Sequence, residues 1–450
     1  MEKILRFLKK YIIPSFLFNL LHPIYHFSLS FLGALIYGFP SKKIKVIGVT
    51  GTKGKTTTCY LIAQILELSG FKTGMATTAL FKIGEKEWVN KTKQTMIGRF
   101  GLQKLLKQMV KSHCIYAVIE TSSEGILQYR HSFIDYDVAV FTNLSPEHIE
   151  RHGSFENYRK AKIKLFEKVA QKKDGIGIYN LDDKNAGYFL KPKITQQYVY
   201  SQQISDARGQ IKNLHLFSNI KQNFNNKKTQ FLFNNEKMEI PLIGEFNVYN
   251  TIAAISTALS QDISLEKIKN ILSKLKSPAG RMELIEKGQN FTIIIDYAHE
   301  PLSLESAYKT ALSLKNQKND NKNQKLICLL GAQGGGRDKN KRMTMGKLAA
   351  QYCDKIILTN EDPYDETPEK IINDIAIGVL ESQEQNFNAK NLFKIIDRRE
   401  AIKTALSLAK KDDIVILTGK GGEVWMCVEN GKKTPWDEKE VVEQELIFLK

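Results

Sequence analysis

A glycine-rich stretch between Val46 and Thr58 carries the residue types that bind a nucleoside triphosphate. Glycines stand at positions 48, 51 and 54, and a Lys-Thr pair follows the last of them. A lysine supplies a point charge for phosphate oxygens, and a threonine hydroxyl is a ligand for Mg2+. The spacing departs from the standard P-loop, in which a glycine would replace Val49. The residues expected to bind the phosphates are Gly51, Thr52, Lys53, Gly54, Lys55, Thr56 and Thr57.

The elements around this stretch are expected to aim it at an anion. Residues 45–49 have the pattern of a buried strand, and a helical pattern of apolar residues runs from Lys55 to a stop at Gly70. A strand, a glycine turn and a helix N-terminus point backbone N–H groups and the helix dipole at a phosphate. The alternative, a glycine-rich turn with an incidental Lys-Thr pair, does not account for this order.

The rest of the chain predicts two α/β domains. Strands at Ala117–Glu120 and Val138–Asn143 end in polar residues, and carboxyl ends of parallel strands collect ligand-binding residues. A helix is predicted at 155–170, edge hairpins within 200–239, and helices at 247–260 and 265–275. Strands at 291–296, 325–330, 355–359 and 414–417 alternate with helices. We expect an apolar N-terminal helical segment (1–43), a doubly wound P-loop ATPase-like domain (44–276) and a Rossmann-like α/β domain (277–450), with substrates in a cleft between the two domains.

Composition restricts the class of partner. The 450 residues carry a net charge of +18, but the basic residues are dispersed and form no compact motif with interleaved aromatic residues. A nucleic-acid partner is therefore not expected. Binding of polyanionic nucleotide substrates, beside an anionic membrane, explains the positive net charge as well as a nucleic-acid partner would. The five cysteines form no Cys-x-x-Cys motif and follow no secretory signal, so free thiols in a reducing cytoplasm are expected.

The N-terminal segment allows three alternatives. Residues 11–41 contain no Asp, Glu, Lys or Arg and are flanked by Lys9-Lys10 and Lys42-Lys43. Their number suffices for a membrane span, but prolines, histidines and serines interrupt the apolar run. No small-residue cleavage site is present, so a signal peptide is not expected. The alternatives are an amphipathic segment lying on the membrane surface, a helical pair docked on the core, and a true span.

Further motifs follow the glycine loop in a fixed order. They are Glu120-Thr-Ser-Ser123, Asn143-Leu-Ser-Pro-Glu-His148, Tyr158–Phe166, Asn247–Asn250, Gly280-Arg281-Met-Glu283, Asp296-Tyr-Ala-His299 and Gly331–Arg342. Over residues 36–450, this set resembles the Mur ligase family, and most closely the MurE type. The resemblance implies that ATP converts a substrate carboxylate to an acyl phosphate, which an amine then attacks. The acceptor of the MurE type is UDP-N-acetylmuramoyl-L-alanyl-D-glutamate, a peptidoglycan precursor.

The resemblance also implies roles for single residues. It places Mg2+ on Thr56, Glu120, His148 and a carbamylated Lys162, and the catalytic roles on Lys55, Lys162, His148 and Arg281. ATP is expected to contact Asn247, Asn250, Arg281, Asp296, His299, Arg337 and Asp397. Without the resemblance, His148 would be a structural histidine and Lys162 one basic residue on a solvated helix face. The residues shared across the family are all present, which favours a working enzyme: Lys55, Glu120, His148, Asn247, Asn250, Arg281 and Asp296.

The chain departs from the family pattern where the substrates bind. Residues 1–44 stand where the MurE type has a larger uridine-nucleotide domain. The diaminopimelate-selecting Asp-Asn-Pro-Arg motif becomes Glu361-Asp362-Pro363-Tyr364, and a tyrosine cannot replace the planar cationic fork of arginine. Diaminopimelate is therefore disfavoured. The residues expected to contact the acceptor or the amino acid are Thr95, Ser122, Ser123, Arg130, Asp362, Pro363, Tyr364, Gly419 and Glu423.

Three functions remain open at this point. The first is an amide ligase that couples a free amino acid to a UDP-muramoyl-dipeptide-like acceptor with ATP and Mg2+. The second is a related ligase with a lipid-linked muramoyl or polyglutamyl acceptor. The third is a membrane-associated nucleotide-binding partner protein without turnover. We expect a cytoplasmic monomer whose residues 1–40 contact the inner face of the membrane.

Overall fold

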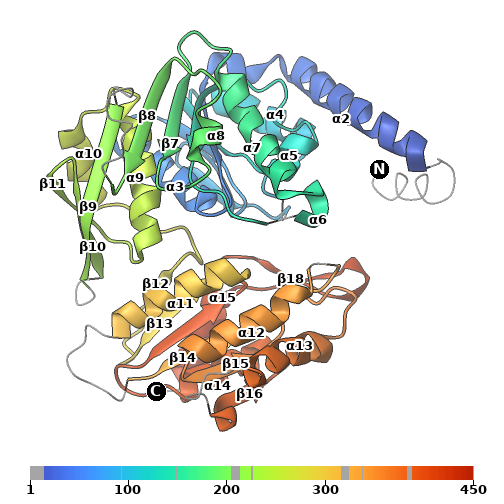
Figure 1. The fold of residues 1–450 in the computed structure, drawn as a ribbon, viewed down its shortest axis with the longest axis vertical. Coiled ribbons are helices and arrows are strands. Elements are labelled where there is room, and N and C mark those ends of the chain that lie inside the picture. Colours follow the sequence, from blue (N-terminus) through green and yellow to red (C-terminus); the bar gives the residue numbers. More distant parts are fainter. Residues whose placement is uncertain are drawn as a thin grey trace. The chain divides into compact units, whose positions relative to one another are not determined.

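The computed structural model divides the chain into two compact units (Figure 1). Unit 1 comprises Met1–Asn219, Phe231–Met238 and Tyr249–Leu275, and unit 2 comprises Ile220–Gln230, Glu239–Val248 and Lys276–Lys450. The described residues are 15–92, 94–147, 149–203, 213–223, 227–315, 324–336, 338–382 and 388–448.

The larger sheet holds eleven strands among these residues. Its strands are β1 (Lys45–Thr50), β2 (Thr73–Ala76), β3 (Leu80–Ile83), β4 (Lys86–Val89), β5 (Tyr116–Glu120), β6 (Tyr136–Phe141), β7 (Ile176–Asn180), β8 (Gln196–Ser201), β9 (Asn213–Asn223), β10 (Lys228–Phe233) and β11 (Glu236–Ile240). Their order is β11-β10-β9-β8-β7-β6-β1-β5-β2-β3-β4, so the region predicted to form edge hairpins does lie at an edge.

The centre of this sheet brings three strand ends together. β1 runs parallel to β5 on one side and to β6 on the other. The register pairs Val49 with Glu120 and Thr50 with Phe141, so the loops that follow these strands begin at the same edge. Brought together in this way, the glycine loop, the Glu120 motif and the Asn143 motif can form one site.

Four helices of this part of the chain lie where they were predicted, namely α3, α7, α9 and α10 in the following list. The helices are α2 (Ser15–Tyr37), α3 (Lys55–Leu68), α4 (Arg99–Lys111), α5 (Ser123–Leu127), α6 (Ile149–His152), α7 (Phe155–Val169), α8 (Ala186–Phe189), α9 (Glu245–Leu259) and α10 (Leu265–Leu272). α3 ends as expected at Gly70, whose φ is +96° and whose N–H donates to the Glu67 carbonyl at 2.8 Å.

Unit 2 has its own six-stranded sheet among the described residues, in the order β12-β13-β17-β14-β15-β16. Its elements are β12 (Glu283–Ile285), β13 (Thr292–Asp296), α11 (Pro301–Lys315), β14 (Leu326–Leu330), α12 (Asn340–Tyr352), β15 (Lys355–Leu358), α13 (Pro368–Leu380), β16 (Leu392–Lys394), α14 (Arg398–Ser407), β17 (Ile414–Thr418), the pair β18 (Trp425–Cys427) and β19 (Lys433–Pro435), and α15 (Glu438–Phe448). β12 is antiparallel, and the other five strands are parallel.

Alternate residues of these strands face two separate cores. Ile294 and Cys328 pack with α11, α12 and α13, whereas Ile293 and Ile327 pack with α14 and α15. Helices therefore cover both faces of the sheet, as a doubly wound α/β fold requires (Figure 1). The fold class expected from the sequence is confirmed.

The expectation of five free thiols was wrong. Cys328 on β14 and Cys353 at the end of α12 form a disulfide, with their Cα atoms 6.0 Å apart. The remaining cysteines, Cys59, Cys114 and Cys427, are free and buried. The paired cysteines lie 25 residues apart in the sequence, and only the packing of α12 on the sheet brings them together.

The N-terminal segment forms one long helix in its described part. α2 continues through Pro23 and packs on α4, where the backbone of Arg99 and Phe100 approaches Gly33. Its described part is thus docked on unit 1 as a single helix, which agrees best with the docked alternative of the three, and residues 1–14 lie outside the described residues. No helix in the described part of the chain has the length and apolar character that crossing a membrane requires.

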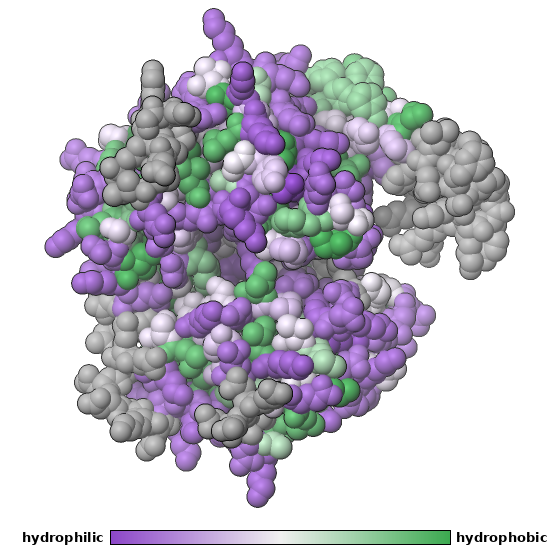
Figure 2. All heavy atoms as spheres, viewed as in Figure 1, coloured by the Kyte–Doolittle hydropathy of each residue, from purple (hydrophilic) through white to green (hydrophobic). Residues whose placement is uncertain are grey.

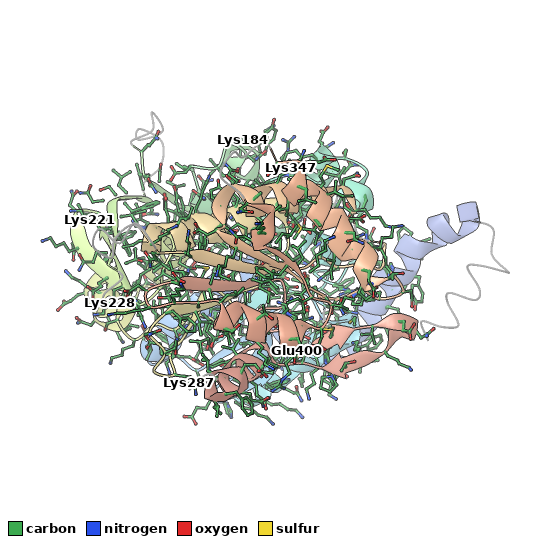
Figure 3. All side chains as sticks on the ribbon, turned by 90° about the horizontal axis from the view of Figure 1, so that it is seen from below. Lys184, Lys221, Lys228, Lys287, Lys347 and Glu400 are labelled. Carbon is green, nitrogen blue, oxygen red and sulfur yellow. A yellow bond between two sulfur atoms is a disulfide. The ribbon has the colours of Figure 1, made fainter. Side chains whose placement is uncertain are left out.

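Exposed lysines lie on both units. The lysines labelled in Figure 3 project outward from different parts of the chain. They are Lys184, Lys221, Lys228, Lys287 and Lys347.

Candidate active site

Two glycines shape the loop between β1 and α3. A Cβ atom on Gly51 would clash with the Thr142 hydroxyl, and one on Gly54 would clash with the Asn250 amide oxygen. Gly54 also has a φ of +78°, a conformation that strains residues with side chains. It is the N-cap of α3, so the helix start offers backbone N–H groups to an anion instead of to a capping side chain.

Lys55 and Thr56 lie at the start of α3 beside a buried carboxylate. Lys55 Nζ donates to the Thr52 carbonyl at 2.7 Å, which folds the lysine back over the loop. Thr56 Oγ1 donates to Glu120 Oε2 at 2.8 Å, and the Thr78 backbone N–H donates to the same oxygen at 2.7 Å. Glu120 is only 2% exposed. A hydroxyl and a carboxylate are therefore held together next to the phosphate loop.

Lys162 is buried against the same loop and does not lie on a solvated face of α7. It is 1% exposed, and its Nζ donates to the Gly51 carbonyl at 2.6 Å. The Tyr158 ring lies 4.6 Å from this nitrogen, and the Tyr158 hydroxyl lies 3.1 Å from Thr52 Oγ1. Burial, and then the positive charge of Lys55, holds the pKa of Lys162 well below its usual value. The neutral amine is thus favoured at this position.

The loop after β6 supports the phosphate loop from the other side. The Lys53 N–H donates to Asn143 Oδ1 at 2.9 Å. Further along, His152 Nε2 lies 3.1 Å from the Ser123 hydroxyl, and both residues are buried. His148, the predicted metal ligand of this loop, lies outside the described residues, so its role stays a prediction.

Asn250 and Asn247 occupy the first turns of α9. Asn250 Oδ1 accepts from the Thr58 hydroxyl at 3.3 Å. Asn247 Nδ2 donates to the Ile243 carbonyl at 2.7 Å. Thr57 is buried within α3. These contacts fix the side chains in place, and their predicted contacts with ATP stay predictions.

The predicted acceptor residues of unit 1 form a second polar group. Thr95 Oγ1 accepts from Thr78 Oγ1 at 3.1 Å, and Ser122 caps α5 with its side chain. Arg130 donates to Gln94 Oε1 at 3.0 Å. Because Thr78 also contacts Glu120, this group is continuous with the phosphate site.

In unit 2, Asp296 ends β13 and holds the loop that follows. Its two carboxylate oxygens accept from the Met282 and Ala298 backbone N–H groups, each at 2.8 Å. Burial raises its pKa, and the charge of Arg281 opposes that shift. The Arg281 guanidinium stacks 4.0 Å from the centre of the Tyr297 ring.

His299 belongs to the same loop. Its Nδ1 lies 2.8 Å from the Tyr297 carbonyl oxygen. Lys341 Nζ donates to the His299 carbonyl at 3.1 Å and to Glu300 Oε1 at 2.6 Å. The loop is thereby tied to the start of α12.

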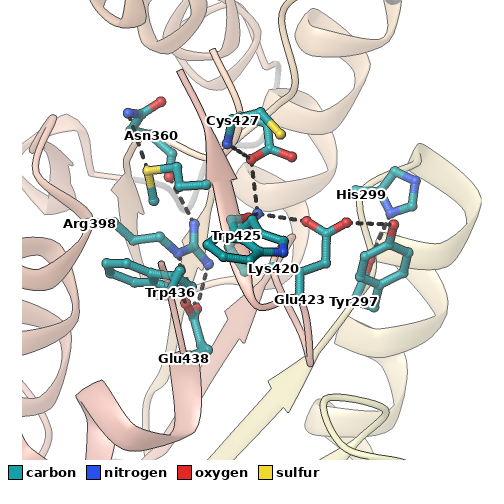
Figure 4. Close-up of polar contacts among 12 residues, drawn as sticks. Tyr297, His299, Asn360, Arg398, Lys420, Glu423, Trp425, Cys427, Trp436 and Glu438 are labelled. Atoms are coloured by element: carbon teal, nitrogen blue, oxygen red, sulfur yellow. Dashed lines mark hydrogen bonds and ion pairs between the residues drawn. The ribbon is translucent and has the colours of Figure 1, made fainter. Parts of the chain in front are cut away.

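A buried lysine organises the loops after β15 and β17 (Figure 4). Lys420 Nζ donates to Asp362 Oδ1 at 3.0 Å, to Glu423 Oε2 at 2.6 Å and to the Trp425 carbonyl at 2.7 Å. The Tyr297 hydroxyl donates to the other Glu423 oxygen at 3.4 Å. Lys420 thus orients two carboxylates at the end of the sheet where substrates bind in open α/β folds.

Glu361 lies beside this group and is fully buried. Neither of its carboxylate oxygens has a hydrogen-bond partner among the described residues, and burial raises its pKa. Gly419, with a φ of +104°, leaves the space in which Glu361 sits. Pro363 is buried, and the Tyr364 N–H donates to the Cys427 carbonyl at 3.1 Å. The predicted amino-acid residues of unit 2 are therefore neighbours.

The Asp397 segment is structural in all its described contacts. Asp397 caps α14 with its side chain. Arg398 is buried, pairs with Glu438 at 2.5 Å and donates to the Thr418 carbonyl at 2.8 Å (Figure 4). Arg337, the other predicted nucleotide contact here, lies outside the described residues. A contact between Asp397 and ATP stays a prediction.

The buried Arg398–Glu438 pair is expected to matter for the stability of the fold. Arg398→Ala leaves the Glu438 carboxylate buried without its cation, so we expect the free energy of unfolding to fall by about 3–5 kcal/mol. Urea denaturation measures the change. Lys403→Ala on the same helix is the matched control, because both side chains of its pair with Glu400 are exposed and the pair should matter little. Equal losses in the two variants would contradict the prediction.

The donor set of unit 1 suits Mg2+. This ion prefers oxygen ligands and is usually bound through one or two carboxylates together with substrate phosphates. The Thr56 hydroxyl and the Glu120 carboxylate provide such ligands beside the phosphate loop. Within the described ranges, no group of three or more His, Cys, Asp and Glu side chains forms a metal site.

Sequence reasoning missed three contributors to this site. Thr78 follows β2 in a hairpin that was not predicted, and its N–H fixes Glu120. Tyr158 stands one helical turn before Lys162, a spacing that would have revealed it. His152 contacts Ser123, and nothing in the sequence distinguishes it from His148.

Comparisons with known proteins agree with this geometry. The Mur ligase middle domain matches residues 49–258, and the glutamate ligase domain of Mur ligases matches residues 280–421. A UDP-N-acetylmuramoyl-L-alanyl-D-glutamate–2,6-diaminopimelate ligase from Clostridium tetani is 36% identical over 412 residues, which cover 91% of this chain and 79% of that protein. A UDP-N-acetylmuramyl-tripeptide synthetase from a Roseiflexus species is 34% identical over 90% of this chain and 79% of its own length.

Solved structures show the same fold. A structure of a UDP-N-acetylmuramoyl-L-alanyl-D-glutamate–2,6-diaminopimelate ligase superimposes with a TM-score of 0.60 and 29% identity, covering 90% of this chain and 79% of that one. A folylpolyglutamate synthase from Mycobacterium tuberculosis reaches a TM-score of 0.66 at 14% identity, with 87% and 92% coverage, which shows the fold alone. The chain therefore belongs to the Mur ligase family, whose members use ATP to add amino acids to peptidoglycan precursors.

Proposed function

We propose that this chain is an ATP- and Mg2+-dependent ligase that adds a free amino acid to a UDP-N-acetylmuramoyl-dipeptide-like acceptor. Residues 44–276 are the ATP-binding domain, and residues 277–450 bind the amino acid. The observation that carries the proposal is the group formed by Lys55, Thr56 and Glu120 with the buried Lys162 at one phosphate loop. The enzyme acts as a cytoplasmic monomer.

The residues of unit 1 suit transfer of a phosphoryl group. Lys55 and the N–H groups at the start of α3 neutralise phosphate charge, and Thr56 and Glu120 hold Mg2+, which supplies further positive charge at the phosphates. An oxygen of the acceptor carboxylate attacks the γ-phosphorus, and ADP leaves. The amine then attacks the acyl carbon, phosphate leaves, and the amine loses a proton. The roles of Arg281 and His299 in this reaction stay predictions.

The environment of Lys162 favours its carbamylation. A neutral amine attacks CO2, forms an N–C bond and loses a proton, and the low pKa of Lys162 favours that neutral form. The product is an anion beside the positive charge of Lys55. Carbamylation thus replaces a neutral amine with an anion that the positive charge of Lys55 attracts.

The carboxylates of unit 2 suit an incoming amine. Glu423 is held by Lys420 and Tyr297 in one orientation and can accept a hydrogen bond from an ammonium or amine group. Tyr364 offers no cation for a second carboxylate, so we do not expect diaminopimelate to be the preferred amino acid.

Product analysis tests the proposed function. The protein is incubated with ATP, Mg2+, UDP-muramoyl dipeptide and single amino acids, and phosphate release and product mass are followed. We expect ADP formation that depends on the acceptor, with a product heavier by one amino-acid residue. ADP formation only with a lipid-linked or glutamyl acceptor would show that this compound, and not the UDP-muramoyl dipeptide, is the acceptor. ATP binding without any acceptor-stimulated hydrolysis would contradict the ligase function.

We also propose that α2 brings the protein to the inner face of the membrane. Small side chains of α2, Ser30 and Ala34, face unit 1 and are buried. Bulky ones point outward: Ile24, Leu35 and Ile36 are 59%, 54% and 61% exposed. Figure 2 shows apolar side chains over the described part of this helix. An outward apolar face next to the exposed Lys42-Lys43 suits an anionic lipid surface.

Vesicle flotation tests this membrane contact. We expect the full chain to float with vesicles that contain phosphatidylglycerol, and the triple variant Ile24→Ser, Leu35→Ser, Ile36→Ser to lose at least about tenfold in bound fraction because apolar burial is lost. The control is Ile115→Ser with Leu127→Ser, which removes exposed apolar side chains elsewhere on unit 1. An unchanged bound fraction would contradict the proposal, and a fall in molar mass for the triple variant would identify a second copy as the occupant.

A further inference from the structure

Tyr297 lies where three loops of unit 2 meet. The Arg281 guanidinium is 4.0 Å from the centre of its ring, and the His299 ring packs edge to face on it with ring centres 4.6 Å apart. Its hydroxyl donates to Glu423 Oε1 at 3.4 Å, a length from which such contacts shorten when ligands bind (Figure 4). The ring therefore contacts two residues expected to bind ATP, and the hydroxyl contacts one expected to bind the amino acid.

Asp296 holds two of these loops against each other. Its two carboxylate oxygens accept from the Met282 and Ala298 backbone N–H groups, each at 2.8 Å. These two groups directly follow Arg281 and Tyr297 in the chain. Because one carboxylate accepts from both loops, their backbones are fixed relative to each other. The backbone therefore keeps the guanidinium and the ring face to face.

Two glycines bring the third loop to the same place. A Cβ atom on Gly280 would clash with the backbone of Gly421, and one on Gly421 would clash with the Tyr297 side chain. Glycine is therefore required at both positions for this close approach. On the other side of the loop, Lys420 Nζ donates to Glu423 Oε2 at 2.6 Å. Glu423 is thus held between a lysine and a tyrosine hydroxyl.

We propose that Tyr297 is a positioning residue that couples the nucleotide site to the amino-acid site, because its ring orients Arg281 for ATP and its hydroxyl orients Glu423 for the incoming amine. The inference rests on the proposed ligase function and adds a link between its two ligands. A nucleotide that fixes Arg281 also fixes the ring stacked on it, so the hydroxyl is already in place when the amine binds. Coupling of this kind is reciprocal, so the amine strengthens nucleotide binding by the same factor.

Two substitutions of Tyr297 separate its contacts. Tyr297→Phe keeps the ring on Arg281 and removes only the hydroxyl, so we expect KM for the amino acid to rise about 3- to 10-fold. The affinity for a nonhydrolysable ATP analogue alone should not change. Tyr297→Leu also removes the aromatic face, so the affinity for the analogue should fall about 3- to 30-fold as well. A purely structural role would not divide the two ligands in this way.

Tyr352→Phe is the matched control. It also removes a hydroxyl that donates to a carboxylate, Glu305 Oε1 at 3.2 Å. Tyr352 is the last residue of α12, whereas Lys341 in the first turn of that helix contacts the loop of His299. The control variant should therefore leave KM for the amino acid and the affinity for the analogue unchanged.

Calorimetry measures the coupling itself, with the β,γ-imido analogue of ATP and each standard amino acid in turn as the probe. In the unmodified protein, we expect the analogue to raise the affinity for an amino acid about 3- to 10-fold, and Tyr297→Phe to abolish this increase. Such coupling without any turnover would support the role of Tyr297 and contradict the ligase. An increase that is absent from the unmodified protein, or equal in Tyr297→Phe, would overturn the proposal whether or not turnover occurs.

Discussion

Lys162→Ala is expected to lower kcat by about 100- to 1,000-fold, the usual effect of removing one electrostatic group at a reacting centre. The unmodified side chain is buried against the Gly51 carbonyl, and its carbamate would place negative charge beside Lys55 and Glu120. Alanine removes that charge, so phosphoryl transfer should fail while ATP binding remains. Steady-state phosphate release and nucleotide binding, measured on the same sample, separate these two effects.

Lys160→Ala is the matched control for this variant. Lys160 lies on the same helix, is exposed and pairs with Glu156 in solvent, so its loss should leave kcat unchanged. Short carboxylic acids such as formate or acetate should restore part of the activity of Lys162→Ala if a carbamate is the missing group. Full activity of Lys162→Ala would contradict a catalytic role for Lys162. Loss of activity that carboxylic acids do not restore would indicate that Lys162 only supports the packing of the site.

The pH dependence of this residue follows from its lowered pKa. Carbamylation consumes the neutral amine, and a pKa well below the usual value keeps that form populated at lower pH. Activation by bicarbonate should therefore persist well below the pH at which an exposed lysine becomes neutral.

The central strand of the larger sheet and the helix after it could be predicted because both follow strong local sequence patterns. β1 and α3 follow a β-branched run, a glycine turn and an amphipathic helix that stops at Gly70. The hairpin β3–β4 was missed because Leu80–Ile83 and Lys86–Val89 are too short and too polar for a clear period of two. The Cys328–Cys353 disulfide could not be predicted, since the contact depends on how α12 packs.

The order of the motifs along the chain was enough to predict which residues form the site. It was less informative about residues whose chemistry depends on burial, such as Lys162. Lys162 was interpretable as a surface residue, but the helix buries Tyr158, Ala161, Leu165 and Phe166 on the same face. Positions 158, 161, 162, 165 and 166 follow the spacing of a buried stripe, so a periodicity test would have placed Lys162 inside. Contacts such as that of Thr78 with Glu120 join distant segments and have no local signature.

Glu120→Gln is expected to lower kcat by about 100- to 1,000-fold and to raise the Mg2+ concentration needed for half-maximal rate by at least about tenfold. Glutamine keeps the shape of the side chain, and its oxygen can still accept from the Thr78 N–H and the Thr56 hydroxyl. The variant therefore removes one negative charge with little change in packing. Mg2+ titrations of phosphate release, together with thermal unfolding, measure the two consequences separately.

Glu266→Gln serves as the control, because this carboxylate on α10 is exposed and also loses its charge. A metal ligand and a structural acceptor predict different results for Glu120→Gln. Loss of a ligand shifts the Mg2+ dependence and leaves unfolding nearly unchanged, since the hydrogen bonds survive. Loss of a structural contact lowers the unfolding temperature and leaves the Mg2+ dependence unchanged. The second result would move the metal away from Glu120 and leave Thr56, with His148 and Lys162, as the remaining predicted ligands.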